Sequence, residues 1–190
     1  MSLSFIETFR GMITDPGATI RKSRSGSLMD SIIYFLIVIL IYSVLTSVIA
    51  LIFGPINPMP LSPAGDIAAI IVFLISLVIG GTIALLIIGG IIHICLKIVG
   101  GRGDYTATVR AFALAETPQA AIGWIPFIGF IGSIWALVLM IMGASEYHKI
   151  SMFRAVIAVL LPIIVIVILA VLGLMFFMVA PGSMTVTQIS

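Results

Sequence analysis

Long apolar stretches, separated by short polar or proline-rich connections, make up most of the chain after its first 28 residues. Crossing about 30 Å of hydrocarbon as an α-helix takes about 20 predominantly apolar residues. Five segments have this length and character, and we predict a spanning helix in each: 29–53, 66–97, 105–123, 127–145 and 152–179. The pattern predicts an all-α fold, a polytopic transmembrane helical bundle of five spans within residues 29–180.

The second predicted span, 66–97, is longer than the membrane requires. At about 1.5 Å per residue, a continuous helix would be about 45 Å long. We expect tilt, or a break at Gly80-Gly81 or Gly89-Gly90, to absorb the excess. Pro162 is expected to bend the last span.

Small residues recur at a spacing of four in the third and fourth spans: Ala107, Ala111 and Ala115, then Gly129 with Ser133 and Gly132 with Ala136. Such rows let two helices approach closely. They predict packing between spans three and four.

Residues 1–28 are more polar, and we predict a separate cytoplasmic unit there. In residues 3–13 the apolar side chains fall on one helical face: Phe5, Ile6, Phe9, Met12 and Ile13. Asp15-Pro16-Gly17 is expected to end this helix, and the basic stretch 21–27 is expected to be a flexible linker. We interpret the helix as an interfacial amphipathic helix lying on the membrane. The alternative is that it packs on the protein's own cytoplasmic loops.

The positions of the basic residues predict the orientation. Lysines and arginines occur before the first span, in the turn at 97–110 and in the loop at 149–154, whereas the loops at 54–65 and 124–126 have none. Five spans place every basic cluster on one side, which the positive-inside rule assigns to the cytoplasm. We therefore expect a cytoplasmic N-terminus and an external tail at 181–190. A re-entrant hairpin of spans three and four would preserve the same charge pattern.

Composition makes lipid the main solvent of this chain. Of its 190 residues, 62% are hydrophobic and 8% charged, with a mean hydropathy of +1.36. Soluble domains carry about 25% charged residues. The sequence has no basic face with the polar or aromatic residues that read nucleic-acid bases, so nothing in it indicates a nucleic-acid partner. The single cysteine, Cys95, rules out an intrachain disulfide.

Glu116 is the most informative residue, because it lies inside a predicted span. Counted from Tyr105, it is about 16 Å deep, near the bilayer midplane. A carboxylate there costs about 2.5–3.5 kcal/mol on insertion scales, so we expect it to face the bundle interior, a partner or water. Pro118 would free a backbone carbonyl near Leu114. This polar site could be a proton relay, a cation site or a hinge, or Glu116 could simply fix helix packing.

Other polar residues suggest weaker sites near the cytoplasmic ends of the spans. Arg110 belongs to the same membrane-embedded polar site as Glu116 and Pro118, and snorkelling to the interface is expected to explain it without any partner. Four further residues share one predicted depth and could form a zinc or other divalent site: His93, Asp104, Glu146 and His148. They lack a short paired spacing, so ordinary interfacial residues are the favoured interpretation. We expect no cofactor.

The residues Gly101-Arg102-Gly103-Asp104 match the GxGD motif of intramembrane aspartyl proteases. Such an enzyme needs a second aspartate, because one must be protonated while the other activates water. Asp30 is the candidate at the same depth. Since Gly-rich turns produce this motif often, the protease remains a remote alternative.

A longer pattern resembles a known family. It comprises the Gly-rich turn 100–105, Arg110 and Pro118 in the helix that follows, Ile134-Trp135 and the loop 148–151. It resembles the Yip1-domain family of five-span membrane proteins, in its prokaryotic form. The resemblance implies a non-enzymatic, multi-pass integral membrane protein, in the cell membrane of a prokaryote, that organises membrane or binds membrane-protein partners. Eukaryotic members bind small GTPases. The alternative function is a small oligomeric transporter or channel component that uses Glu116, which would require a homo-oligomer.

Overall fold

The computed structural model describes residues 4–53 and 67–179, and within them every regular element is helical. In chain order the elements are α1 (Phe5–Thr14), α2 (Pro16–Lys22), the short 3-10 helix η1 (Ser23–Ser25), α3 (Leu28–Phe53), α4 (Ile67–Ile98), α5 (Tyr105–Ala115), the π-helix η2 (Gln119–Gly123), α6 (Gly129–His148) and α7 (Met152–Val179). The all-α prediction is confirmed. The predicted loop at 54–65 and the predicted tail at 181–190 lie outside the described residues.

Within the described residues, four helices are long and apolar enough to cross a membrane: α3, α4, α6 and α7. Their bounds lie within a few residues of the predicted spans. The predicted third span, 105–123, is not one continuous helix, because α5 ends at Ala115 and η2 begins at Gln119. The five-crossing topology and its orientation therefore stay predictions.

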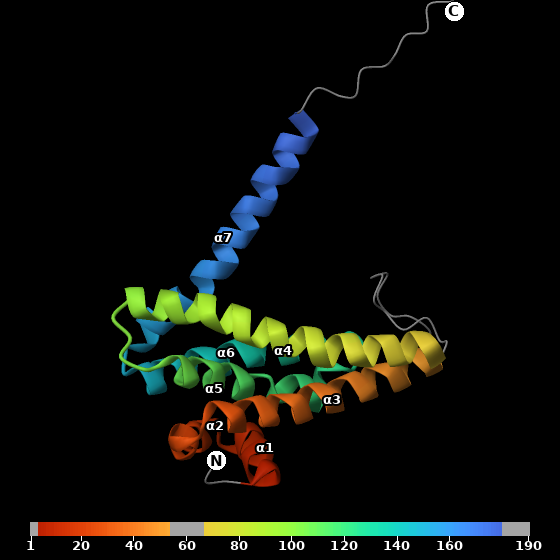
Figure 1. The fold of residues 1–190 in the computed structure, drawn as a ribbon, viewed down its shortest axis with the longest axis horizontal. Coiled ribbons are helices and arrows are strands. Elements are labelled where there is room, and N and C mark those ends of the chain that lie inside the picture. Colours follow the sequence, from red (N-terminus) through yellow and green to blue (C-terminus); the bar gives the residue numbers. More distant parts are fainter. Residues whose placement is uncertain (1–3, 54–66, 180–190) are drawn as a thin grey trace, which may run out of the picture.

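Helices α3, α4, α5 and α6 lie alongside one another, whereas α7 leaves the group at a steep angle (Figure 1). The first part of α7 packs on α4 and α6 and buries Ala155, Ala158 and Val159. Beyond Pro162, every residue from Ile163 to Met175 is exposed. Lipid is the solvent that suits such a uniformly apolar surface.

Helix α4 runs unbroken through both glycine pairs, so the expected break is absent. The glycines instead admit neighbouring side chains. A Cβ added at Gly81 would collide with Cδ1 of Ile39 on α3, and one added at Gly89 would lie 3.5 Å from Cγ2 of Val109 on α5. Close approach of α3 and α4 therefore accounts for Gly81, whereas a side chain at Gly89 would make only an ordinary contact with α5.

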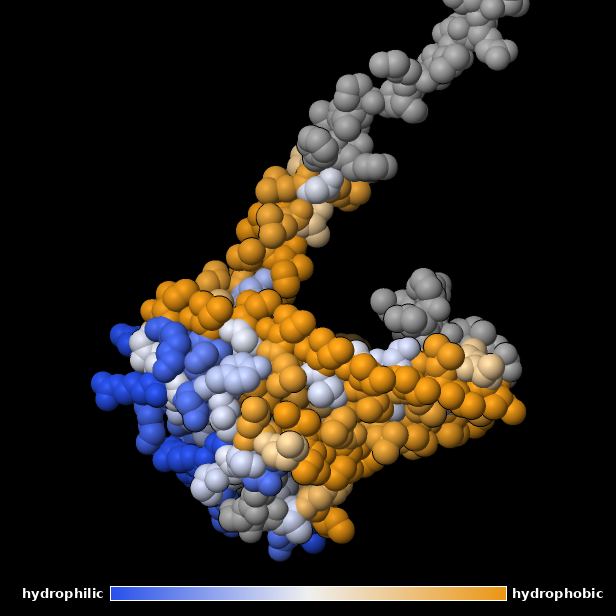
Figure 2. Space-filling model, in the orientation of Figure 1, coloured by the Kyte–Doolittle hydropathy of each residue, from blue (hydrophilic) through white to orange (hydrophobic). Residues whose placement is uncertain are grey.

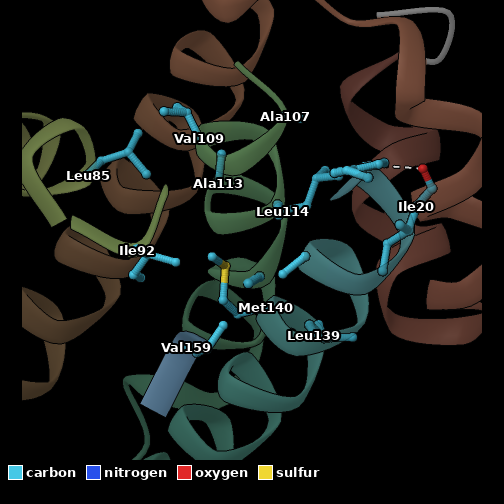
Figure 3. Packing of buried hydrophobic residues seen from close by; sticks show 14 of the residues in the cluster. Ile20, Leu85, Ile92, Ala107, Val109, Ala113, Leu114, Leu139, Met140 and Val159 are labelled. Carbon is cyan, nitrogen blue, oxygen red and sulfur yellow. Dashed lines mark hydrogen bonds between the residues drawn. The ribbon is translucent and has the colours of Figure 1, made fainter. Parts of the chain in front are cut away.

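Helices α5 and α6 pack closely, as their small residues predicted. A Cβ added at Gly143 would lie 2.9 Å from Cβ of Ala111, and one at Gly132 would lie 3.3 Å from the carbonyl oxygen of Pro118. Much of the core forms around α5, where Val109, Ala113 and Leu114 are buried among residues of the other helices (Figure 3).

The N-terminal segment packs on the bundle. Met12 and Ile20 are buried in the same core cluster, and the ring of Phe5 lies 5.3 Å from that of Tyr34 on α3. The Tyr147 hydroxyl donates to the Ile20 carbonyl, the bond drawn in Figure 3. This part of the N-terminal segment therefore packs on the protein, as in the alternative given above, but on helices α3 and α6 rather than on cytoplasmic loops.

The predicted flexible linker at 21–27 is wrong for most of its length. Asp15 ends α1, but its side chain also accepts from the Ala18 N–H and Pro16 occupies the first turn, so a second helix starts at once. Helix α2 then continues to Lys22 and η1 to Ser25. At the start of α1, Ser4 and Glu7 form a capping box, and backbone and side-chain bonds from Ser4 lower the pKa of the Glu7 carboxyl.

Polar residues collect at one end of the molecule, while α3, α4 and α7 present apolar surfaces (Figure 2). That end contains the N-terminal helices, the α4–α5 turn and the α6–α7 connection (Figure 1). We call it the polar end.

Candidate functional site

The site begins at the interruption between α5 and η2. Pro118 cannot donate a backbone hydrogen bond, and the Thr117 hydroxyl donates to the Leu114 carbonyl at 2.7 Å. The same hydroxyl lies 2.7 Å from the hydroxyl of Tyr34 on α3. The predicted free carbonyl near Leu114 is therefore satisfied by a side chain, and the interruption is tied to α3. Glu116 is the C-cap of α5 at this interruption.

Glu116 faces a cavity of about 670 Å³ between α3, α4, the α5–η2 interruption and the start of α6. This volume is in the range of small-molecule sites, about 300–1,000 Å³. Gln119 and Ser133 also line it, and the Gln119 amide donates to the Ser133 hydroxyl at 2.9 Å. The cavity therefore combines a carboxylate with an otherwise largely apolar lining.

Several polar groups of the lining have no partner. Trp124 Nε1 and Thr46 Oγ1 are buried without a hydrogen bond. The Glu116 carboxylate forms no ion pair and accepts no hydrogen bond from any residue the structure describes. Native proteins leave few buried polar atoms unpaired, so each such atom calls for an explanation such as strain, a catalytic role, or a bound water or ion.

Arg110, grouped with Glu116 and Pro118 in the sequence analysis, is not among the residues that line the cavity. Its guanidinium donates to the carbonyls of Arg24 and Gly26 and lies 5.5 Å from the Tyr147 ring centroid. The residue is 5% exposed, so the expected snorkelling is wrong. Arg110 instead fastens the N-terminal segment to α5 and α6.

The four residues considered for a metal site are divided among three roles. His93 and His148 share the Thr108 hydroxyl, at 2.7 and 2.8 Å. Asp104 caps α5 by accepting from the Ala107 N–H, and Glu146 pairs with Arg24. In residues 4–53 and 67–179, no three His, Cys, Asp or Glu side chains are placed to hold a metal ion.

The glycine turn of the GxGD motif fits around His148. A Cβ added at Gly101 or Gly103 would lie 2.9 Å from His148 Nδ1, and the Arg102 N–H donates to the His148 carbonyl at 2.9 Å. Both aspartates considered for proteolysis have capping roles. Asp104 caps α5, and Asp30 accepts from the Ser27 N–H at 2.8 Å. Packing and capping account for the motif.

Sequence reasoning identified Glu116 but missed the other polar groups of the cavity. Tyr42 and Thr46 come from α3 and Trp124 from the turn after η2. A tryptophan in a short apolar turn is the one local signal, and the same position between two predicted spans is equally typical of an interfacial residue.

The family model of the Yip1 domain matches residues 10–175, which is most of the chain. The chain belongs to the Yip1 domain family. A search of curated proteins and a search of solved structures each gave no match.

The Yip1 domain therefore begins within α1 and ends within α7. It includes most of the docked N-terminal segment and the cavity at Glu116. Yip1 domain proteins are generally non-enzymatic membrane proteins, and the apolar helices make this chain an integral, multi-pass one.

Proposed function

We propose that this protein is a non-enzymatic membrane organiser that contacts the cytoplasmic leaflet, and partner proteins there, through its polar end. The docked N-terminal segment is the observation that carries the proposal. Because Arg110 and Tyr147 hold this segment, its outer surface has a fixed shape. That surface exposes Ile6 and Ile13 together with Arg10 and Arg21.

This combination suits an anionic membrane surface. Each basic residue near such a surface contributes about 1 kcal/mol of attraction. Exposed isoleucines on a short helix can enter the boundary between headgroups and acyl chains. Arg102, Lys149 and Arg154 add exposed charge on the same polar end. The segment is therefore proposed to rest on the leaflet with one part of its surface and on the bundle with the other.

A fluorophore at position 6 tests this contact. We would replace Cys95 with alanine, introduce Ile6→Cys, attach an environment-sensitive dye and reconstitute the full chain in vesicles containing brominated lipid. The dye should be quenched in anionic vesicles and less so in neutral ones. Arg10→Glu with Arg21→Glu should remove this difference, as should high salt. The matched control carries the dye at Thr14, another exposed position of α1. If the dye at position 6 is quenched in neither kind of vesicle, contact with the leaflet is refuted.

We also propose the five-crossing topology, with α5 and η2 together forming the broken third crossing, the N-terminus cytoplasmic and the C-terminus outside. Phe127 is 95% exposed in the turn between η2 and α6 and gives the sharpest test. In a Cys95→Ala background, Phe127→Cys should react with an impermeant thiol reagent added outside the cell. Reaction only from the cytoplasmic side, or none, would favour the re-entrant hairpin.

A second candidate function is transport, and the cavity beside Glu116 is the observation that favours it. Transporters commonly place substrate sites at interrupted helices near the bilayer midplane. If the protein is such a transporter, ion flux into liposomes should occur with the parent chain and stop with Glu116→Gln. Equal flux in both proteins would remove Glu116 as the coupling group.

A further inference from the structure

We infer that the cavity at Glu116 binds an amphiphile whose head carries an ammonium group and an acceptor oxygen. This inference concerns a different surface from the leaflet proposal and requires no transport, so it stands or fails separately from both.

The cation must come from a ligand because no residue in 4–53 or 67–179 supplies one to Glu116. Arg110, the only lysine or arginine of the described helices that is buried, is engaged with the carbonyls of Arg24 and Gly26. The other lysines and arginines are exposed. An ionised carboxylate at this depth is costly unless a cation pairs with it.

The lining also suits a cation by its aromatic content. Six aromatic residues surround the cavity: Phe35, Tyr42, Phe112, Trp124, Phe127 and Phe130. The faces of aromatic rings attract organic cations, more strongly when the cation is desolvated. A carboxylate among several rings is thus selective for an ammonium group over a neutral or anionic head.

The unpartnered donors define the second feature of the ligand. Trp124 Nε1 can only donate, and the hydroxyl of Thr46 can do so as well. Both atoms lie beneath the cavity surface in this structure, so they would have to turn toward the cavity before a hydroxyl, ester or phosphate-ester oxygen beside the ammonium group could accept from them. The remaining lining is apolar, including Val38 and Leu85, and would contact the ligand's hydrocarbon part.

Two sources have this chemistry: the headgroup of an amino-phospholipid and a free amphiphilic amine. The cavity volume of about 670 Å³ accommodates either kind of head with part of its chain.

Fluorescence of Trp124 gives a direct binding test. The chain has two tryptophans, and Trp135→Phe leaves Trp124 as the only reporter. We would titrate this variant of the full chain with decylammonium in a neutral maltoside detergent. Saturable change is expected, and Glu116→Gln should raise the Kd about tenfold or more, because a charge-assisted bond is lost. Glu146→Gln, which removes a carboxylate outside the cavity, should bind as the parent does.

Further probes decide the chemistry and the source. Decanol, of equal chain length, should bind weakly and equally to the parent and Glu116→Gln. Displacement of decylammonium by a short-chain phosphatidylethanolamine, but not by phosphatidylglycerol, would support the inference with lipid as the source. Displacement by neither lipid would support it with a free amine as the source.

The inference is overturned if Glu116→Gln binds decylammonium as tightly as the parent, or if decanol binds as tightly as decylammonium. Should Glu116→Gln fail to fold, Thr46→Val keeps the shape and removes one unpartnered donor. Since decylammonium lacks the acceptor oxygen, this variant is titrated with the phosphatidylethanolamine, whose Kd should rise about threefold or more. An unchanged Kd would remove the acceptor-oxygen part of the inference.

Discussion

At the polar end of the bundle, most buried polar side chains bond one another or the backbone, although Ser23 Oγ, Arg110 Nε and His148 Nδ1 have no partner. Arg110, Tyr147 and Thr108 each bond groups from another part of the chain. Beside the cavity, the side chains of Trp124 and Thr46 form no hydrogen bond with any residue that the structure describes. Bonded groups of this kind stabilise a fold, and unbonded ones lower its stability unless a ligand completes them.

A charged residue within a predicted span can be bonded to the rest of the protein or can line a cavity without a partner. Arg110 and Glu116 lie six positions apart on the same predicted span and look equally unusual in the sequence. The structure gives Arg110 two carbonyl acceptors and an aromatic ring, and gives Glu116 a cavity. Substitutions at the polar end and at the cavity should therefore change the free energy of unfolding by different amounts.

The largest loss is expected for Arg110→Met. It removes bonds to two carbonyls and the contact with Tyr147 while keeping an unbranched side chain. The free energy of unfolding should fall by about 2–4 kcal/mol. Thermal unfolding in detergent measures this, and trypsin should cleave faster after Arg21 as the N-terminal segment detaches. Arg102→Met, at an exposed position, is the control, and a parent-like melting temperature for Arg110→Met would contradict the polar-end half of the comparison.

Helix packing near the polar end can be tested by replacing each of two glycines, in separate variants, with alanine. A Cβ at Gly143 would lie 2.9 Å from Ala111 Cβ, whereas one at Gly80 meets nothing within 4 Å. Gly143→Ala should cost about 1–3 kcal/mol by overpacking. Gly80→Ala should raise stability by about 0.5–1 kcal/mol, because alanine favours the helix. Equal melting temperatures for the two variants would show that α5 and α6 are less closely packed than described.

A smaller loss is expected for Thr108→Val, which keeps the side-chain shape and removes the hydroxyl shared by His93 and His148. Leaving two ring nitrogens without this partner should cost about 1–2 kcal/mol. Thr106→Val, on the same helix, is the matched control for the lower helix propensity of valine. If both variants unfold at the same temperature, the hydroxyl bridge contributes nothing measurable.

The helices could be predicted closely because their cause is local. Apolar runs predicted α3 at 29–53 and α4 at 66–97, within a residue or so of the observed bounds. The interruption of 105–123 could not be predicted in the same way, although Pro118 is visible. A membrane helix can accommodate a proline, and here the Thr117–Tyr34 bond helps to fix the broken form.

The remaining misses depend on long-range contacts. An amphipathic face that includes Phe5 has the same pattern whether it meets lipid or Tyr34 on α3. Likewise, Glu116 can be recognised in the sequence because a carboxylate is costly to bury. Thr46 and Trp124 line the same cavity only because α3 and η2 fold next to each other, which the sequence pattern does not reveal. Periodicity predicts which side of a helix is apolar and not what covers it.

The smallest effect, and the one that most sharpens the comparison, is expected for Glu116→Gln without ligand. No described residue bonds the carboxylate, so nothing is lost, and a neutral amide is cheaper to place at this depth than an ionised carboxylate. The unfolding free energy should stay within about 0.5 kcal/mol of the parent or rise. Thermal unfolding of Glu116→Gln and Arg110→Met under the same conditions measures the difference in stability between the two variants. A loss as large as that of Arg110→Met would mean that Glu116 holds the helices together, and the cavity and the polar end would then serve the same structural purpose.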